Sequence, residues 1–460
     1  MGIEKFQSWL FNNYYDTQSN SDNRTYDHIY FDLNYLLHKS ISYASDENAL
    51  INNVISTINN QISKNHPIKS INLVADGSAN YAKILLQKKR RLLTIKNPTN
   101  ATLNPLILTT GTMFMNTFDD AIKTYAKSTF NSINVNLDLS KNCGEAEFKI
   151  CKLLRKNGST LSDTHLIISN DADTILIALS QINVFNIFVL ISNNNNHRTY
   201  VVSIDKLTES IFENYGYMYN KKLDFVFISL LNGNDYFPKL KYTNIDKLWD
   251  VYNKTVKKNE FIVNLNCTIN ISKLIDFICG ILSTIPSKMK SVSLNEYNFD
   301  DVTSYMFGLQ WCIQLYTTGE YPTYDYIHNA NAIHPSSLLM YIIDYRKKNE
   351  CNTTSLIQCD DGDKIPSEFY TVFVIPFNRL DLVQDKFHNI IKEKLMYMYD
   401  EEFCEKCKKY RSQLKLLGNC KSKEISSVKK KYSKHHKIHT IKNPCEYIKK
   451  IYDALMLFDK

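Results

Sequence analysis

The sequence contains no long apolar segment. No stretch approaches the roughly 18 consecutive apolar residues that a membrane-spanning helix requires. Its eleven cysteines lack the dense, even spacing of a disulfide scaffold. The stretch MGIEKFQSWLFNNYY has no apolar core of the kind found in signal peptides, and Phe6 stands where a myristoylation site has Ser or Thr. These absences predict a protein of a reducing compartment. The sequence also has no internal repeat. We expect the cytoplasm and leave the nucleus open.

Length and composition allow several domains. At 460 residues with 44% hydrophobic side chains, the chain can bury a large core and should form two or three domains. The net charge of +8 permits a polyanionic partner without requiring one. The pattern of segments predicts an α/β domain over residues 1–240, a helical connector over 241–300, a second helical region over 301–400, and a basic extension with Cys and His over 401–460.

Residues 1–240 alternate strand-like and helix-like segments. The candidate strands are HIYFDLN (28–34), INLVADG (71–77), HLIISNDAD (165–173) and FNIFVLIS (185–192). The segment DFVFISLLNG (224–233) is long enough to favour a buried helix that ends at Gly233. This alternation predicts an α/β fold with a mostly parallel sheet, followed by a mainly helical second region.

Acidic side chains follow three of these four strands, at the edge where open parallel sheets bind their ligands. Two further acidic clusters occur in CGEAEFKI and LNGNDYF. A single Asp at a strand end is more often a cap or turn residue, but a converging set would repel strongly unless positive charge lay among its members. Mg²⁺ and Mn²⁺ prefer oxygen ligands, and two such ions support phosphodiester hydrolysis. The candidate ligands are Asp32, Asp76, Glu145, Glu147, Asp171, Asp173 and Asp235.

A basic helical face follows the second candidate strand. In VADGSANYAKILLQKKRR (74–91), a helix that begins near residue 78 would place Lys83, Gln87, Arg90 and Arg91 on one face. Such a face is usually just solvated. Because Asp76 lies close by, we favour a pocket in which the four side chains bind a terminal phosphate through charge-assisted hydrogen bonds.

Seven blocks of the sequence, in order, resemble the 5′-3′ exoribonucleases of the XRN type. They are MGIEKFQSWL, YFDLNYLLH, DGSANYAKILLQKKRR, GEAEFKI, NDADTILIAL and FISLLNGNDYFP, and then a second region that contains SYMFGLQWCIQLYTTG, PSSLLMYI and PSEFYTVFVIPF. The resemblance covers most of the chain. It implies that the chain has a PIN/FEN-like nuclease domain and is a compact homologue of this family. The compact size and AT-rich-genome composition fit a large DNA virus or a protist, and a viral protein would act in the host cytoplasm.

The resemblance also implies an activity. The chain would degrade 5′-monophosphorylated single-stranded RNA to mononucleotides by two-metal-ion hydrolysis, as a monomer and without a membrane partner. The seven acids would be catalytic and would hold two Mg²⁺ or Mn²⁺ ions, and Lys83, Gln87, Arg90 and Arg91 would bind the 5′-phosphate. His38 would stack on the first bases.

The sequence departs from the family at one aromatic position. Where the family has a Trp-rich segment that faces the stacking His, EYPTYDYIH offers Tyr321, Tyr324 and Tyr326. Tyrosine can stack on a base, and Tyr324 is our candidate, although all three side chains could simply pack.

Two other functions remain open. A flap-endonuclease-like enzyme acting on branched DNA would share the MGI start and the acid set, but FDLNYLLH, the basic face and GLQW argue against it. An inactive RNA-binding scaffold would be expected to have lost some of the acids, and all seven are present.

The C-terminal extension contains a Cys/His pattern. The motif CEKC at 404–407 is followed by Cys420, by His435, His436 and His439, and by Cys445. The pairs C-x₂-C and H-x₃-H suit a structural Zn²⁺ ion, but the 27 residues between them exceed the spacing of common fingers. We therefore favour a reduced helical tail. Its eight lysines over residues 421–442 would either contact the RNA backbone or remain solvated.

Overall fold

The computed structural model describes most of the chain. The described residues are 3, 6–20, 24–96, 102–192, 199–212, 221–286, 298–328, 331–360, 362–417, 423–436, 439, 441 and 443–458.

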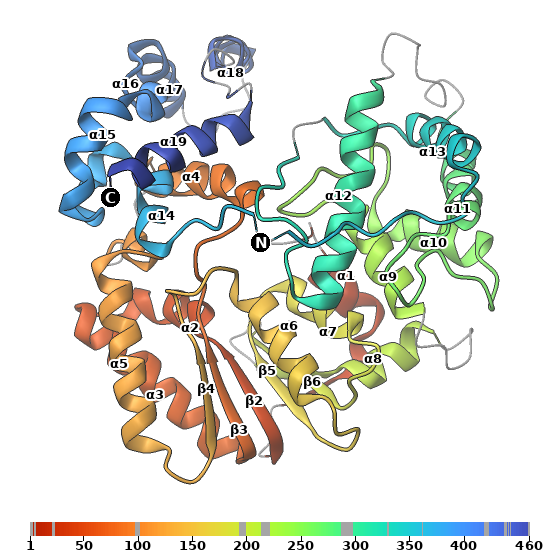
Figure 1. The fold of residues 1–460 in the computed structure, drawn as a ribbon, viewed down its shortest axis with the longest axis horizontal. Coiled ribbons are helices and arrows are strands. Elements are labelled where there is room, and N and C mark those ends of the chain that lie inside the picture. Colours follow the sequence, from red (N-terminus) through yellow and green to blue (C-terminus); the bar gives the residue numbers. More distant parts are fainter. Residues whose placement is uncertain are drawn as a thin grey trace.

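A seven-stranded sheet lies at the centre of the N-terminal half (Figure 1). The strand order is β1-β7-β6-β5-β2-β3-β4, in which the run from β6 to β4 is parallel and β7 pairs antiparallel with β1 and β6. The predicted α/β fold with a mostly parallel sheet is therefore confirmed. The strands are β1 (Gln18–Asn20), β2 (Tyr26–Asp32), β3 (Pro67–Val74), β4 (Asn134–Asp138), β5 (His165–Ile168), β6 (Ile187–Ser192) and β7 (Thr199–Ser203).

The four predicted strands are all present, as β2, β3, β5 and β6. The acidic tails of two of them lie beyond the strand, because β3 ends at Val74 and β5 ends at Ile168. Strands β1, β4 and β7 were missed; they have only three to five residues each, and β1 and β4 are rich in polar side chains.

Helices cover both faces of the sheet. Ile29 and Phe31 of β2 point to the face covered by α2 (Leu33–Ser40), α3 (Glu47–Asn65) and α5 (Met113–Thr129), whereas Tyr30 points to the opposite face. The helices on that opposite face are α1 (Phe6–Asn13), α6 (Ala146–Asn157), α7 (Ala172–Ser180), α8 (Ile204–Ile211) and α9 (Lys221–Leu230). Helix α9 is the buried helix expected before Gly233.

The core on this second face continues beyond residue 240. The ring of Phe225 in α9 packs edge-on against Trp249 in α10 at 5.1 Å, and Phe148 in α6 packs against Tyr316 in α12 at 5.5 Å. The connector and the start of the second region therefore share one core with the sheet. These helices are α10 (Ile245–Thr255), α11 (Ile271–Ser283), α12 (Phe299–Thr318) and α13 (Pro335–Asn349).

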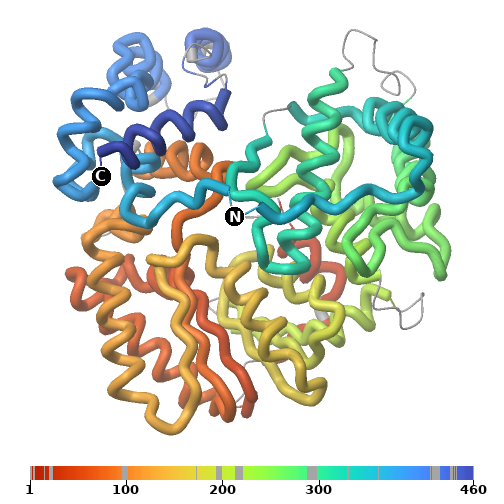
Figure 2. The backbone as a smooth tube through the Cα atoms, viewed as in Figure 1, coloured from red at the N-terminus to blue at the C-terminus, as the bar shows by residue number. Residues whose placement is uncertain are grey.

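A separate cluster forms around α4 (Tyr81–Lys96). The chain after α13 runs across the molecule, and its last helices lie over α4 (Figure 2). Lys88 of α4 donates a hydrogen bond to the carbonyl of Met398 at 2.6 Å. The helices of this cap are α14 (Ser367–Val374), α15 (His388–Lys394), α16 (Asp400–Phe403), α17 (Glu405–Leu417), α18 (Lys423–His436) and α19 (Pro444–Phe458). Among the helices described, none has the length and apolar character needed to cross a bilayer.

Candidate active site

Two of the predicted acids cap helices at the same edge of the sheet. Asp32 ends β2 and accepts a hydrogen bond from the N–H of Tyr35 in the first turn of α2 at 3.0 Å. Asp171 accepts the N–H of Asp173 in the first turn of α7, also at 3.0 Å. Because β5 pairs directly with β2, these two caps lie side by side.

Asp76 joins this edge from the loop after β3. Its N–H donates to the side-chain oxygen of Asn34, and its own Oδ1 accepts the N–H of Ala146 at the start of α6, both at 2.8 Å. The N–H of the neighbouring Gly77 donates to the carbonyl of Gly144 at 2.8 Å, and the N–H of Gly144 donates to the carbonyl of Ser78 at 2.9 Å. A Cβ at Gly77 would lie 1.6 Å from the carbonyl oxygen of Asn142, so only glycine fits this close approach.

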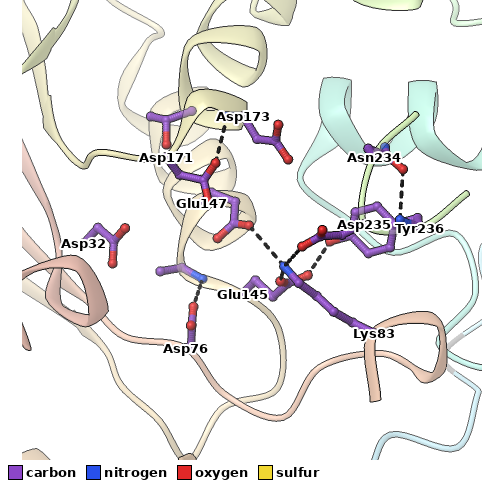
Figure 3. A network of polar contacts seen from close by, with 12 residues as sticks. Asp32, Asp76, Lys83, Glu145, Glu147, Asp171, Asp173, Asn234, Asp235 and Tyr236 are labelled. Atoms are coloured by element: carbon purple, nitrogen blue, oxygen red, sulfur yellow. Dashed lines mark hydrogen bonds and ion pairs between the residues drawn. The ribbon is translucent and has the colours of Figure 1, made fainter. Parts of the chain in front are cut away.

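Lys83 lies among the remaining acids (Figure 3). Its ammonium group forms an ion pair with Glu145 and lies 3.4 Å from Asp235 Oδ2 and 3.9 Å from Glu147 Oε1. Arg90, two turns further along α4, binds Asp235 with two hydrogen bonds of 2.7 and 3.1 Å. Two members of the predicted phosphate-binding set therefore neutralise acids in this structure.

A pocket of about 550 Å³ connects the acids with the basic face of α4. The other two members of that face, Gln87 and Arg91, hydrogen-bond to each other, and Arg91 Nε donates to Thr109 Oγ1 at 2.8 Å. Six of the seven acids and all four residues of the basic face line the pocket, namely Asp32, Asp76, Glu145, Glu147, Asp171, Asp235, Lys83, Gln87, Arg90 and Arg91.

Asp173 does not line this pocket. Its carboxylate is buried and accepts hydrogen bonds from the hydroxyl of Tyr316 at 3.0 Å and from the N–H of Ile3 at 3.4 Å. Asp173 lies in the first turn of α7, two residues after Asp171, so it adjoins the acidic cluster on the side away from the pocket.

Negative charge is in excess at this site. Burial, together with nearby carboxylates, raises the pKa of Asp32 and of Asp173 to about 7. At Asp235, burial would raise the pKa, but Lys83 and Arg90 outweigh it and lower the pKa below its ordinary value. Lys83 and Arg90 contact three of the seven carboxylates. Among the residues that the structure describes, no ion pair reaches the other four, which are Asp32, Asp76, Asp171 and Asp173. Oxygen ligands in such number are what Mg²⁺ and Mn²⁺ prefer, so the donor set fits these ions.

Buried tyrosine hydroxyls donate hydrogen bonds to two of the acids, a role that was not predicted from the sequence. Tyr236 and Tyr321 both donate to Glu145 Oε2, the latter at 3.2 Å, and Tyr316 donates to Asp173. Burial and the neighbouring carboxylates raise the pKa of Tyr236 and Tyr321 well above its ordinary value, so both stay protonated and able to donate. Each of these tyrosines is more than 90 residues along the chain from the acid that it contacts, so no spacing motif links the two.

The two predicted stacking residues have different positions. His38 is exposed on α2 and lines the pocket, as its expected role requires. Tyr324 does not line the pocket: its ring is 9% exposed and packs against Tyr321 at 4.8 Å. The expectation that Tyr324 stacks on a base does not fit this arrangement, because packing buries the ring. The aromatic residue of the cap that reaches the pocket wall is Tyr370 in α14.

Comparison with known sequences identifies relatives of the N-terminal region. The family described as XRN 5′-3′ exonuclease N-terminus matches residues 1–103 and 93–192. A protein of Acanthamoeba polyphaga mimivirus that is named as a 5′-3′ exonuclease is 29% identical over 223 residues. That match covers 42% of this chain and 35% of the mimivirus protein, so it spans about a third of the relative's length.

Solved nuclease structures are similar at low sequence identity. The catalytic core of Rad2 in complex with a DNA substrate is 14% identical, with a TM-score of 0.39, and the match covers 79% of this chain and 97% of that one. The bacteriophage T5 D15 flap endonuclease, in a complex with DNA and metal ions, is 12% identical with a TM-score of 0.35, covering 70% and 91% of the two chains. The sequence matches confirm the resemblance stated above: residues 1–192 of this chain are similar to the N-terminal region of the XRN-type 5′-3′ exonucleases.

Proposed function

We propose that the protein is a divalent-metal-dependent 5′-3′ exoribonuclease that removes mononucleotides from 5′-monophosphorylated single-stranded RNA. The observation that carries this proposal is the continuity of one pocket, in which six carboxylates at the sheet edge adjoin the basic face of α4. An exonuclease needs both parts in contact, because the distance between the end-binding site and the hydrolytic site sets where the chain is cut.

The carboxylates would hold the metal ions. Two ions bound by the seven acids would supply the positive charge that stabilises the attacking and leaving oxygens of a phosphodiester displacement. Water adds to the phosphate between the first two nucleotides, and the O3′ of the first nucleotide leaves and takes up a proton. The products are a 5′-mononucleotide and an RNA that carries a new 5′-phosphate.

The chain's own residues would position the RNA end. Arg91 and Gln87 line the pocket wall, and a terminal phosphate there can accept hydrogen bonds from the N–H groups that Arg91 does not use on Thr109 or Gln87 and from the Gln87 amide. His38 is exposed at the same pocket, where it can stack on a base. The cap keeps α4 in place through Lys88, whose ammonium group lies over the ring of Tyr399 at 5.2 Å.

A degradation assay with four substrates tests the proposal. RNA and DNA of one sequence, each with a 5′-phosphate or a 5′-hydroxyl and a 3′ fluorophore, are incubated with Mg²⁺, and the products are separated by length. We expect stepwise loss of mononucleotides from 5′-phosphorylated RNA. Degradation of DNA alone, or cuts only at internal branch points of added flap substrates, would overturn it in favour of a flap-type nuclease.

A further inference from the structure

A second group of metal-binding side chains lies in the cap, far along the chain from the acidic pocket. Cys404 joins α16 to α17, Cys407 is in the first turn of α17, and His435 and His439 lie at and just after the end of α18. One ligand atom from each of the four lies within 4.8 Å of all the others. The Sγ of Cys404 and the Nε2 of His435 are already 3.2 Å apart.

This arrangement has the chemistry of a structural zinc site. In a tetrahedral Zn²⁺ site the metal lies about 2.3 Å from sulfur and about 2.0–2.1 Å from nitrogen, which places the ligand atoms roughly 3.3–3.8 Å apart. The four atoms here need only a small contraction to reach that geometry. Two thiolates and two imidazoles are soft ligands that select zinc over Mg²⁺ or Ca²⁺. All four positions are filled by protein, so the site leaves none open for catalysis.

The helices that carry these ligands have almost no core of their own. Among the described side chains of α17 and α18, only Cys407 and Ile425 are buried. The next helix, α19, differs, because Ile448, Ile451 and Leu455 are each 0% exposed and pack in the apolar cluster around α14 and α15. A helical pair that buries so little apolar surface needs a covalent or metal cross-link to stay folded.

We propose that Cys404, Cys407, His435 and His439 bind one structural Zn²⁺ ion, which joins α17 to α18. The ion holds the basic helix α18 in a fixed place on the cap. This role is separate from hydrolysis, and it stands whether or not the proposed nuclease activity is correct.

The metal content of the 460-residue chain tests this inference. We expect about one zinc per chain by mass spectrometry of the metals after purification without added zinc. Replacement of the zinc with Co²⁺ should give the visible absorption of a tetrahedral site and a near-ultraviolet thiolate charge-transfer band. The double variant Cys404→Ser/Cys407→Ser should lose both signals. The matched variant Cys351→Ser, which changes an exposed cysteine outside the group, should keep them.

One further variant distinguishes this site from the acidic pocket. Asp171→Asn should retain the zinc and the cobalt spectrum in full, because Asp171 lies in the acidic pocket. Wild-type protein that contains no zinc, or that gives no tetrahedral cobalt spectrum with its thiols reduced, would overturn the inference. Loss of zinc in Asp171→Asn would overturn it as well. The wild-type measurements decide the matter even if the double variant fails to fold.

Discussion

The acidic pocket and the Cys/His group of the cap are built in opposite ways. The acids come from residues spread between positions 32 and 235, and strand ends, helix caps and buried tyrosine hydroxyls hold them at the edge of a large core. The four Cys and His ligands come from residues 404–439 and lie on helices that bury little apolar surface. In the first region the fold would position the ligands for a metal; in the second, the metal would stabilise the fold. Metal removal should therefore affect activity in one region and structure in the other.

The largest expected effect is the loss of hydrolysis in Asp171→Asn. This change removes one carboxylate charge from the pocket while keeping the size of the side chain, and we expect the rate to fall roughly 10²–10³-fold or more, as for other losses of transition-state charge stabilisation. The fold should be unaffected, since an Asn can still cap α7. The control Asp120→Asn changes an exposed acid on α5 and should leave the rate unchanged. Full activity in Asp171→Asn would contradict the assignment of the acids.

Zinc removal should give the opposite pattern. After Zn²⁺ is extracted from the cap, we expect α17 and α18 to unfold locally, because little else holds them, while the sheet stays folded. Limited proteolysis should then cut within residues 405–436, and the mononucleotide release from a short RNA in Mg²⁺ should persist. Cleavage that begins in the sheet region instead would show that the ion is not a local cross-link.

A smaller effect is expected at the end-binding face. Arg90 lines the pocket beside Gln87 and Arg91, and we expect it to bind the 5′-phosphate with them when RNA is present. Arg90→Ala should then reduce the preference for a 5′-phosphate over a 5′-hydroxyl about 10–100-fold, the size expected for a lost hydrogen bond to a charged group. Lys89→Ala, which changes an exposed neighbour on α4, is the control. If Arg90→Ala instead slows the degradation of 5′-phosphorylated RNA and of 5′-hydroxyl RNA equally, the role of Arg90 is to position Asp235, which it binds in this structure.

The smallest effect is expected for a residue that positions an acid. Tyr236→Phe removes one of the two hydroxyls that donate to Glu145, and with Tyr321 still in place we expect the rate to fall about 10-fold. Tyr326→Phe is the matched control, because the Tyr326 hydroxyl is buried and has no hydrogen-bond partner among the described residues. A rate unchanged in Tyr236→Phe would show that this hydrogen bond does not help to position Glu145.

The sequence predicted the features that depend on local pattern. Acids after Phe31 and Val74 could be assigned to one edge because parallel strands bring their carboxyl ends together, and the face of α4 followed from helical periodicity. The C-x₂-C and H-x₃-H pairs were also visible, but their separation of 27 residues argued against a common site. In the structure α17 packs against α18, and this contact brings the two pairs together. The spacing rules for common zinc fingers do not describe such an arrangement.

Features that depend on packing between distant segments could not be predicted. The ion pair of Lys83 with Glu145 depends on how α4 meets the start of α6. The hydrogen bonds that Tyr236 and Tyr321 donate to Glu145 depend on the loops after α9 and after α12. Tyr324 follows Tyr321 by three residues and is buried like it, but its ring does not line the pocket. In a loop without regular periodicity, side-chain direction is set by tertiary contacts alone.

Anomalous diffraction from crystals soaked in Mn²⁺ tests the central claim most directly. The account predicts two manganese peaks, about 3.5–4 Å apart, between the carboxylates of the pocket and next to the basic face of α4. It predicts a separate zinc peak, and no manganese, at Cys404, Cys407, His435 and His439. A pocket without manganese, with Lys83 still paired to Glu145, would contradict the assignment of these acids as a two-metal hydrolytic centre.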